Sequence, residues 1–271
     1  MNDGGAEDSS EPGKRSLTRR TVAKVSGLAA ASMAALLGLV TDAFDVEVSA
    51  ERASSEDDEQ IPPSRKTISL PRPRTVEGDV HVAKAIADRR SRRNYTDEPI
   101  TQAEIGQLLW AAQGITERHV GRVDFRAAPS AGATYPLDVY VVSDSPGIRG
   151  MQPGVYHYRP QDHELARVET GSFGAEMQEI AIDQRWVGDA ALNIVITAVD
   201  ERTTQRYGDR GRRRYVPMEA GHAGQNIYLQ AEALDLSTVA IGAFRDGDLR
   251  SLLQVEEDHR PLYIYPVGKR Q

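Results

Sequence analysis

The sequence predicts an α+β domain that follows an N-terminal segment outside the fold. Helical and strand patterns interleave irregularly, and no β-α-β unit recurs at intervals of about thirty residues. Of the 271 residues, 39% are hydrophobic and 27% are charged, which is too apolar for a disordered chain and long enough to bury a core. The net charge of -7 disfavours binding of the whole chain to nucleic acid.

Residues 1–50 have the pattern of an export signal. A basic stretch with Thr18-Arg19-Arg20-Thr21-Val22-Ala23-Lys24 precedes the apolar residues 25–40 and the small residues Val48-Ser49-Ala50. This order is typical of a signal peptide, and the paired arginines resemble a twin-arginine signal. We expect export by a twin-arginine-type route or, if the segment is not cleaved, an anchor at the outer face of the membrane.

Residues 51–76 are expected to form an acidic, proline-rich linker. They contain the charge run Glu56-Asp57-Asp58-Glu59 and the prolines Pro62, Pro63, Pro71 and Pro73. Such a composition does not support a periodic element. The folded domain is therefore expected over 77–271, and no internal repeat divides it.

Hydrophobic spacing predicts the elements of this domain. Helices are expected from Val82 toward Arg89, over 101–114, 172–184 and 217–234, and from a cap at Asp246. Strands are expected over 136–142, 192–199, 237–242 and 262–267, with a hairpin of 155–158 and 165–168. Thr101 and Glu104 have capping-box spacing, Gly114 is a stop signal, and Pro217 suits a first helical turn.

Four arginines, Arg89, Arg90, Arg92 and Arg93, surround Ser91 at the end of the first expected helix. Guanidinium groups and a hydroxyl are donors that suit a phosphate. The same run could be a solvated basic face. A nucleic-acid patch is a further alternative, disfavoured by the lack of interleaved aromatic residues.

Three other segments could approach a ligand. The small-residue loop 129–136 precedes a strand, and Ile241-Gly242-Ala243-Phe244 ends one, so both allow close backbone approach. In the basic segment 206–215, Tyr207 could donate a proton, and Arg206 or Arg210 could stabilise an anion. Each could also be an ordinary loop or exposed surface.

Several classes of site lack support. The chain has no cysteine, which excludes disulfides, thiolate metal sites and cysteine nucleophiles. The histidines do not pair at ligand spacing; Glu219 and His222 have the Glu-x-x-His spacing, but the surrounding four-helix pattern is missing, so no metal site is expected. No Walker loop, Rossmann fingerprint or nucleophile elbow occurs.

Taken together, these segments resemble the FMN-dependent nitroreductase family, and within it the SagB-type dehydrogenase branch. The similarity runs from Ile68 to Arg270. Its blocks are Ile68-Ser69-Leu70-Pro71-Arg72-Pro73, Arg89-Arg90-Ser91-Arg92-Arg93-Asn94-Tyr95, Ala128-Pro129-Ser130-Ala131-Gly132-Ala133-Thr134-Tyr135-Pro136-Leu137, Gly154-Val155-Tyr156-His157-Tyr158, Glu219-Ala220-Gly221-His222-Ala223-Gly224-Gln225-Asn226, Gly242-Ala243-Phe244 and Pro266-Val267-Gly268-Lys269.

The resemblance implies a mostly antiparallel sheet flanked by helices, in a homodimer with FMN at the subunit interface. It implies that the flavin phosphate and pyrimidine edge are held by Arg89, Arg90, Ser91 and Arg93, with Lys269 and Arg270 helping to clamp the phosphate. It further implies that Ile241, Gly242 and Ala243 lie beside the reactive flavin nitrogen, and that the partner subunit contributes Pro129, Ser130, Ala131 and Gly132.

The sequence departs from the family at two positions. Ala133 stands where many members have Asn, and Arg206-Tyr207 stands where azole-forming members have a Lys-Tyr pair. Since arginine stays protonated, it is a poor base, whereas Tyr207 remains a candidate proton relay. The expected function is therefore an FMN oxidoreductase working by a ping-pong cycle with small-molecule donor and acceptor. The alternatives are an azoline dehydrogenase of a modified peptide and a non-catalytic flavin-binding dimer.

Overall fold

The computed structural model describes residues 66–74, 80–119, 123–145 and 147–271, all within the compact unit Ile61–Gln271. The expected export signal and most of the expected linker lie outside the described residues. In the described part, no helix is both long and apolar enough to cross a membrane.

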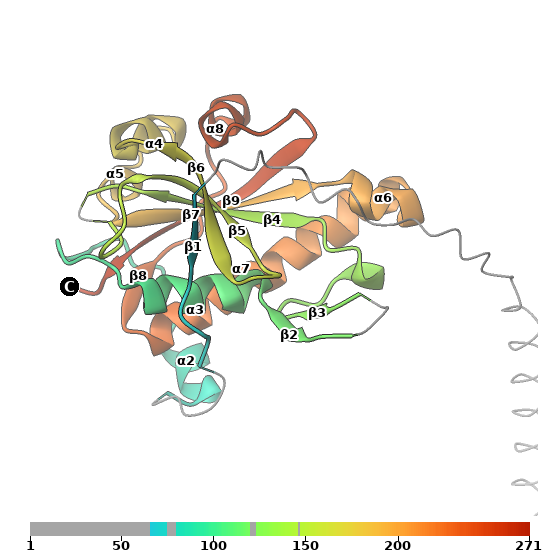
Figure 1. Cartoon of the computed structure of the whole chain (residues 1–271), viewed down its shortest axis with the longest axis horizontal. Helices are drawn as coiled ribbons and strands as arrows, with labels where there is room; N and C mark the ends of the chain where they lie inside the picture. The colour runs from blue at the N-terminus through green and yellow to red at the C-terminus, as the bar shows by residue number, and fades with distance from the viewer. Residues whose placement is uncertain (1–65, 75–79, 120–122, 146) are drawn as a thin grey trace, which may run out of the picture. The chain divides into compact units, whose positions relative to one another are not determined.

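A seven-stranded sheet forms the centre of the fold (Figure 1). In spatial order, its strands are β1 (Thr67–Ser69), β6 (Glu164–Thr170), β5 (Gly154–Arg159), β4 (Leu137–Ser143), β7 (Leu192–Val199), β9 (His259–Lys269) and β8 (Leu236–Thr238). All neighbours in the sheet are antiparallel. A separate two-stranded ribbon pairs β2 (Ile115–Glu117) with β3 (Phe125–Arg126). The α+β class with a mostly antiparallel sheet is confirmed.

Helices cover both faces of this sheet (Figure 1). One face carries α3 (Gln102–Gln113) and α7 (Val216–Ala233), with α2 (Val82–Asp88) against α7; the other carries α4 (Gly174–Ile180), α5 (Arg185–Gly188) and α8 (Asp246–Leu253). Between β7 and α7 come α6 (Glu201–Tyr207) and a π-helical turn, η2 (Gly211–Tyr215). Because both faces are covered, every residue of β7 is buried, which explains its mostly apolar sequence.

The predicted ends of α3 are confirmed, although Gly114 acts by a different mechanism. Thr101 Oγ1 accepts from the backbone nitrogen of Glu104 at 3.2 Å, and Thr101 N donates to Glu104 Oε2 at 2.8 Å, completing the capping box. Gly114 has φ -64°, so it is not a left-handed cap. Instead, a Cβ at this position would lie 2.2 Å from Trp110 Cδ1. Glycine is therefore required by the packing of the Trp110 ring.

Some predicted boundaries differ from the structure. The helix expected over 172–184 ends at Ile180, because Ile182 and Asp183 adopt left-handed backbone (φ 57° for both). The strand expected over 237–242 ends at Thr238. Beyond this strand, Ile241 forms an isolated β-bridge with Ile264. Asp246 is the first residue of α8, and Arg245 is its cap. The sheet also begins at β1, within the segment expected to be a linker.

Two glycines on α7 give opposite predictions for replacement by alanine. A Cβ at buried Gly224 would lie 1.9 Å from Tyr265 Oη and 2.9 Å from Cζ, and this ring is itself buried, whereas a Cβ at Gly221 would meet nothing within 4 Å. Overpacking costs about 1–3 kcal/mol, which outweighs the gain of about 1 kcal/mol in helix propensity. We therefore expect Gly224→Ala to lower the free energy of unfolding and Gly221→Ala to raise it. Urea unfolding of both variants measures this, and equal stabilisation by the two substitutions would contradict the packing around Tyr265.

Candidate functional site

The arginine-rich segment 89–93 lies beside the edge strand β8. Arg92 N donates to Thr238 O at 2.9 Å, so the segment runs along the end of the sheet. Tyr228 of α7 connects it to the segment 240–243, since its hydroxyl lies 2.9 Å from Ser91 Oγ and accepts from Ala240 N at 2.8 Å. Arg89 also stacks over the Tyr228 ring, at 5.1 Å. Two segments far apart in the sequence, both predicted to hold the cofactor, are thus brought together by one tyrosine.

The four arginines of this segment differ in whether a carboxylate lies close to their charge. Arg92 lies 3.6 Å from the carboxylate of Glu232, and its side chain is two-thirds buried. By contrast, Arg89, Arg90 and Arg93 form no ion pair within the described part of the chain. Arg90 instead donates to the carbonyls of Ala87 and Arg89, and Arg93 stacks over Trp186 at 5.1 Å. These three arginines, with the exposed Ser91, form a set of donors that fits a phosphate.

The second predicted strip, Ile241–Ala243, ends at an open surface. Ile241 is buried and paired to Ile264, whereas Gly242 and Ala243 are exposed, and a Cβ at Gly242 would meet nothing within 4 Å. Gln184 Nε2 holds the carbonyl of Ala243 at 3.0 Å. The backbone at Gly242 is therefore held on both sides and exposed, and its role beside a cofactor stays a prediction.

The C-terminal basic pair is already engaged within the chain. Lys269 Nζ pairs with Glu104, and Arg270 pairs with Glu232 at 3.0 Å and with Asp235 at 2.9 Å. A phosphate would have to compete with these carboxylates. The clamp role of Lys269 and Arg270 remains a prediction, and their visible role is to attach the end of β9 to α3 and α7.

The loop 129–132 forms a second cluster with Arg206 and Tyr207 of α6. The short 3-10 helix η1 (Ala131–Ala133) contains Gly132 at φ +63°. A Cβ on Gly132 would lie 2.6 Å from Tyr207 Oη and 3.0 Å from Arg206 Nη1. The exposed Gly132 backbone is thus covered on one side by both residues that the sequence singled out as candidates for chemistry.

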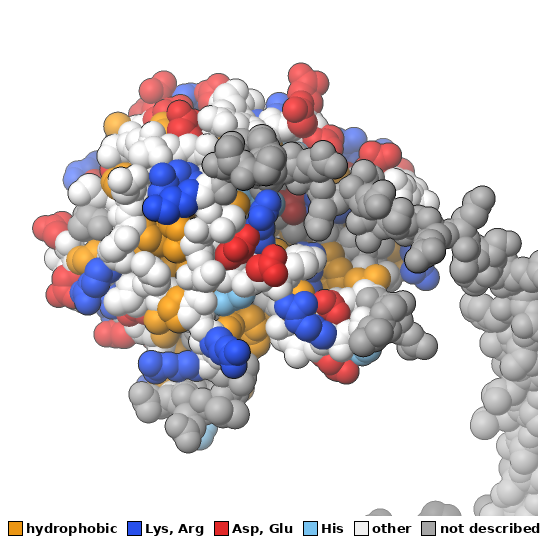
Figure 2. Space-filling view, viewed as in Figure 1, with side chains coloured by type: hydrophobic (Ala, Val, Ile, Leu, Met, Phe, Trp, Pro, Cys, Tyr) orange, Lys and Arg blue, Asp and Glu red, His pale blue; other side chains and the backbone are white. Residues whose placement is uncertain are grey.

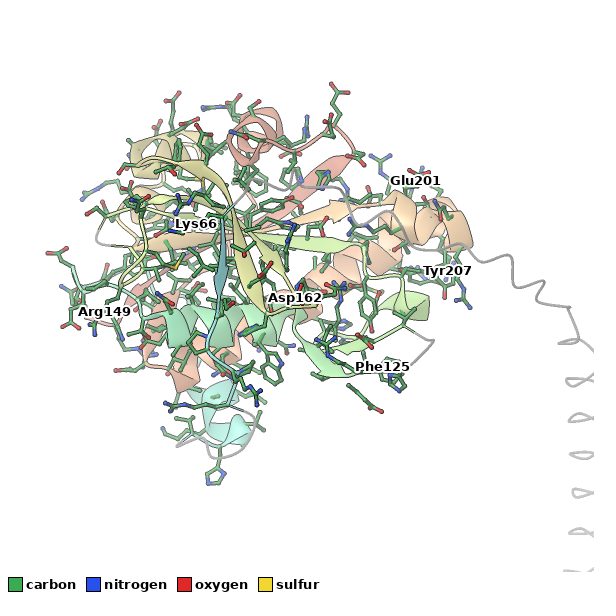
Figure 3. The ribbon with its side chains drawn as sticks, in the orientation of Figure 1. Lys66, Phe125, Arg149, Asp162, Glu201 and Tyr207 are labelled. Carbon is green, nitrogen blue, oxygen red and sulfur yellow. The ribbon has the colours of Figure 1, made fainter. Side chains whose placement is uncertain are left out.

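The segment 206–215 is mostly helical, and most of its residues are exposed, in agreement with the expected exposed surface. Tyr207 ends α6 and meets Tyr215 of η2 edge-on, with ring centroids 5.1 Å apart. Tyr215 Oη in turn accepts from Arg210 Nε at 2.9 Å. Figure 3 shows Tyr207 at the end of α6, on the same side of the molecule as Phe125 of β3. Tyr207 is half-buried, and the ring of Tyr215 packs against its ring.

A buried carboxyl lies behind this loop. Glu219, in the first turn of α7, is 3% exposed, and burial raises its pKa to about 7. The Ser130 hydroxyl, the Arg126 guanidinium and the Gln113 amide oppose this rise. Arg126 Nη1 donates to Gln113 Oε1 at 3.0 Å and its Cζ stacks over the Tyr135 ring at 4.6 Å. In the sequence, the Glu-x-x-His spacing of Glu219 to His222 indicated only a possible metal ligand; no group of three His, Asp or Glu suited to a metal occurs in the described residues.

The two clusters lie toward opposite ends of α7. Tyr228 belongs to the arginine cluster and Glu219 to the loop cluster, and nine residues of helix separate them by roughly 14 Å. Apolar side chains are exposed on the same helices: Met218 of α7 (54%), and Val82 (68%) and Ile86 (58%) of α2. On the face drawn in Figure 2, acidic and basic side chains are interspersed, without a continuous basic surface.

Comparison with known proteins shows the family to which the chain is similar. Residues 86–269 match the nitroreductase family. The nitroreductase-like protein MJ1384 of Methanocaldococcus jannaschii is 41% identical over 193 residues, or 71% of this chain and 92% of that protein. The structure of a nitroreductase-like protein from Ralstonia eutropha JMP134 superimposes with a TM-score of 0.64 at 26% identity, covering 78% of this chain and 92% of that one.

Two more distant relatives carry functional names. The FMN reductase (NAD(P)H) of Bacillus subtilis strain 168 is 27% identical over 198 residues, or 69% of this chain and 63% of that protein. The microcin B17-processing protein McbC of Escherichia coli is 27% identical over 135 residues, or 49% of each chain. This chain therefore spans about half of McbC and slightly less than two thirds of the FMN reductase.

Proposed function

Since the chain belongs to the nitroreductase family, we propose that it is an FMN-dependent oxidoreductase of the SagB-type branch, acting as a homodimer by a ping-pong cycle. The observation that carries this proposal is the donor set of Arg89, Arg90, Arg93 and Ser91, which has no carboxylate partner among the described residues. The similarity to an FMN reductase supports FMN as the cofactor.

Two features support the homodimer: the separation between the arginine cluster and the loop cluster, and the apolar side chains exposed on nearby helices. The arginine cluster and the loop cluster are separated by nine residues along α7, and exposed apolar residues lie on α7 and α2. A second subunit packed there would bury these apolar side chains. It would also bring the loop 129–132 of one subunit toward the arginines of the other.

In this arrangement, FMN supplies reversible hydride transfer, and the chain supplies the surroundings. The free arginines bind the phosphate and the polar ring edge, and so favour the negatively charged reduced form of the cofactor. The backbone at Gly242 leaves room for the ring. Tyr207, fixed against Gly132 and Tyr215, holds a proton at its hydroxyl for the second substrate. Arg206 stays charged and contributes electrostatically.

The test is anaerobic flavin reduction with the purified protein. We expect yellow protein with one FMN per subunit, bleached by a reductant and reoxidised by a quinone or a nitroaromatic compound. A panel of donors is needed, because NAD(P)H is scarce outside the cytoplasm and the N-terminal sequence predicts export. Colourless protein that cannot be reconstituted with FMN would overturn the proposal. Flavin that no donor reduces would favour a non-catalytic flavin-binding dimer.

A second candidate function is oxidation of azolines in a modified peptide, which the similarity to McbC favours. Arg206, in place of a lysine base, and the expected export of the chain both count against it. Incubating the oxidised holoenzyme with a thiazoline-containing peptide and following the loss of two hydrogens by mass spectrometry distinguishes the two functions.

A further inference from the structure

Glu219 is a buried carboxyl that no part of the proposed mechanism uses. It is 3% exposed in the first turn of α7, directly behind the loop that carries Ser130. No carboxylate–cation pair in the described residues includes it, although Arg126 is close enough to affect its charge. Burying a charged carboxylate without a close ion pair is costly, so this environment favours the protonated acid.

The surroundings of Glu219 leave hydrogen-bonding capacity open. Glu219 Oε1 and Gln113 Nε2 are both buried, and neither completes a hydrogen bond among the described residues. Gln113 is itself held, since its Oε1 accepts from Arg126 Nη1. Glu219 therefore has a buried oxygen with no hydrogen bond, which can gain or lose a proton without breaking an existing one.

Ser130 connects this carboxyl to the open side of the loop. Its Oγ accepts from Tyr135 N at 2.9 Å, which leaves the hydroxyl hydrogen free to point elsewhere, and the hydroxyl interacts with Glu219. Two residues later, the Gly132 backbone lies against Tyr207 Oη. The charged and titratable groups facing Glu219 are Arg126 and, around Arg126, Asp138, Arg202 and Tyr135.

We propose that Glu219 stores the proton that the second half-reaction consumes and resupplies it to Tyr207 by way of the Ser130 hydroxyl. This inference rests on the proposed function. With a quinone as acceptor, the quinone gains a hydride from the reduced cofactor and a proton from the Tyr207 hydroxyl, and becomes the hydroquinone. Tyr207 regains a proton through Ser130 from the Glu219 acid, and the resulting carboxylate is reprotonated from water. Glu219 is thus a positioning residue that acts through two others.

The first test needs no cofactor. Infrared difference spectra of the wild-type protein between pH 6 and pH 8.5 should show the loss of a protonated carboxyl band, since the pKa of Glu219 is raised to about 7. That band should be missing in Glu219→Gln, which preserves shape and removes the titration. If Glu219→Gln retains the band, another carboxyl is responsible and the inference is wrong.

The second test uses the reduced holoenzyme and benzoquinone in stopped flow. In the wild type, the reoxidation rate should fall as pH rises through about 7, since only the acid form supplies a proton. Glu219→Gln should be about tenfold slower at pH 6, nearly independent of pH, and close to wild type at pH 8.5. The matched control is His222→Gln, an exposed titratable residue three positions further along α7, which should keep the wild-type profile.

The two tests separate failure of the inference from failure of the proposed function. If the protein loads FMN and is reoxidised by quinone but Glu219→Gln keeps the pH dependence, the proton store is wrong and the oxidoreductase stands. If FMN does not bind at all, the oxidoreductase proposal fails, and the role of Glu219 in it fails as well. Ser130→Ala should reproduce the flattened profile while keeping the infrared band of Glu219, whose loss should move to higher pH because the Ser130 hydroxyl opposes the rise of this pKa.

Discussion

Replacing Arg89 and Arg93 together by alanine is expected to weaken FMN binding by about a hundredfold or more. Each charged hydrogen bond contributes about 1.5–3 kcal/mol, and two of them correspond to between two and four powers of ten in affinity. We expect the lower end, because Arg93 is exposed and solvent screens its charge. The measurement is fluorescence titration of the apoprotein with FMN at fixed salt concentration.

Riboflavin, which lacks the phosphate, makes this experiment specific. If the two arginines bind the phosphate, the double variant should lose its preference for FMN over riboflavin, whereas riboflavin affinity should change little. The control variant is Lys66→Gln/Arg159→Gln, which removes the same charge from the residue before β1 and from the end of β5, on the half of the sheet away from the β8 edge. An equal loss of affinity in the control, or an equal loss for riboflavin, would show that the arginines act through net charge or through packing on Tyr228 and Trp186.

The limits of a strand are predicted well where the local run of apolar residues is enough to determine them. The run 192–199 is strongly apolar and becomes β7 with the predicted limits, because both faces of the sheet are covered. The 237–242 run has similar composition, yet β8 covers only its beginning. There, the strand ends because the chain leaves the sheet edge to meet Tyr228, which is a tertiary contact without a local signal.

The sequence predicts which segments form the candidate site, but it does not predict which of their arginines lie against a carboxylate. The arginine run has one composition, but Arg92 is placed against Glu232, while Arg89, Arg90 and Arg93 have no such partner among the described residues. Residues from distant helices make this distinction, and sequence spacing carries no information on it. Tyr228 was missed for the same reason, since its hydroxyl joins Ser91 to Ala240 across the fold.

Glu219 belongs to a motif that can be found in the sequence, but its burial cannot be predicted from that motif. Its spacing to His222 resembles that of a metal-binding pair, but the four-helix pattern that such a site needs is missing from the sequence. What makes Glu219 distinctive is burial behind Ser130, and burial of one helical residue under a loop depends on how α7 and η1 pack. The nearest available signal was a carboxylate at a position of α7 that shares a face with the buried Ala220, Ala223 and Ile227.

Removing the hydroxyl of Tyr207 is expected to slow reoxidation of the reduced holoenzyme by quinone between a hundredfold and ten-thousandfold. This is the usual contribution of a positioned proton donor. Tyr207→Phe keeps the ring that meets Tyr215 at 5.1 Å, so the fold and the Gly132 turn should be preserved. Chemical reduction of the flavin by dithionite needs no proton donor from the protein, so its rate should change little.

The matched control is Tyr215→Phe, which removes a neighbouring hydroxyl from the same aromatic pair. Tyr215 Oη accepts from Arg210 Nε, and the atoms nearest to a Cβ on Gly132 belong to Tyr207 and Arg206, so the loss of the Tyr215 hydroxyl should leave quinone reoxidation close to wild type. If both variants are slowed equally, the aromatic pair is important for packing and not for proton transfer. If Tyr207→Phe reacts like the wild type at pH 6, the proton comes directly from water, because the acid form of Glu219 would then have no route to the acceptor through Tyr207.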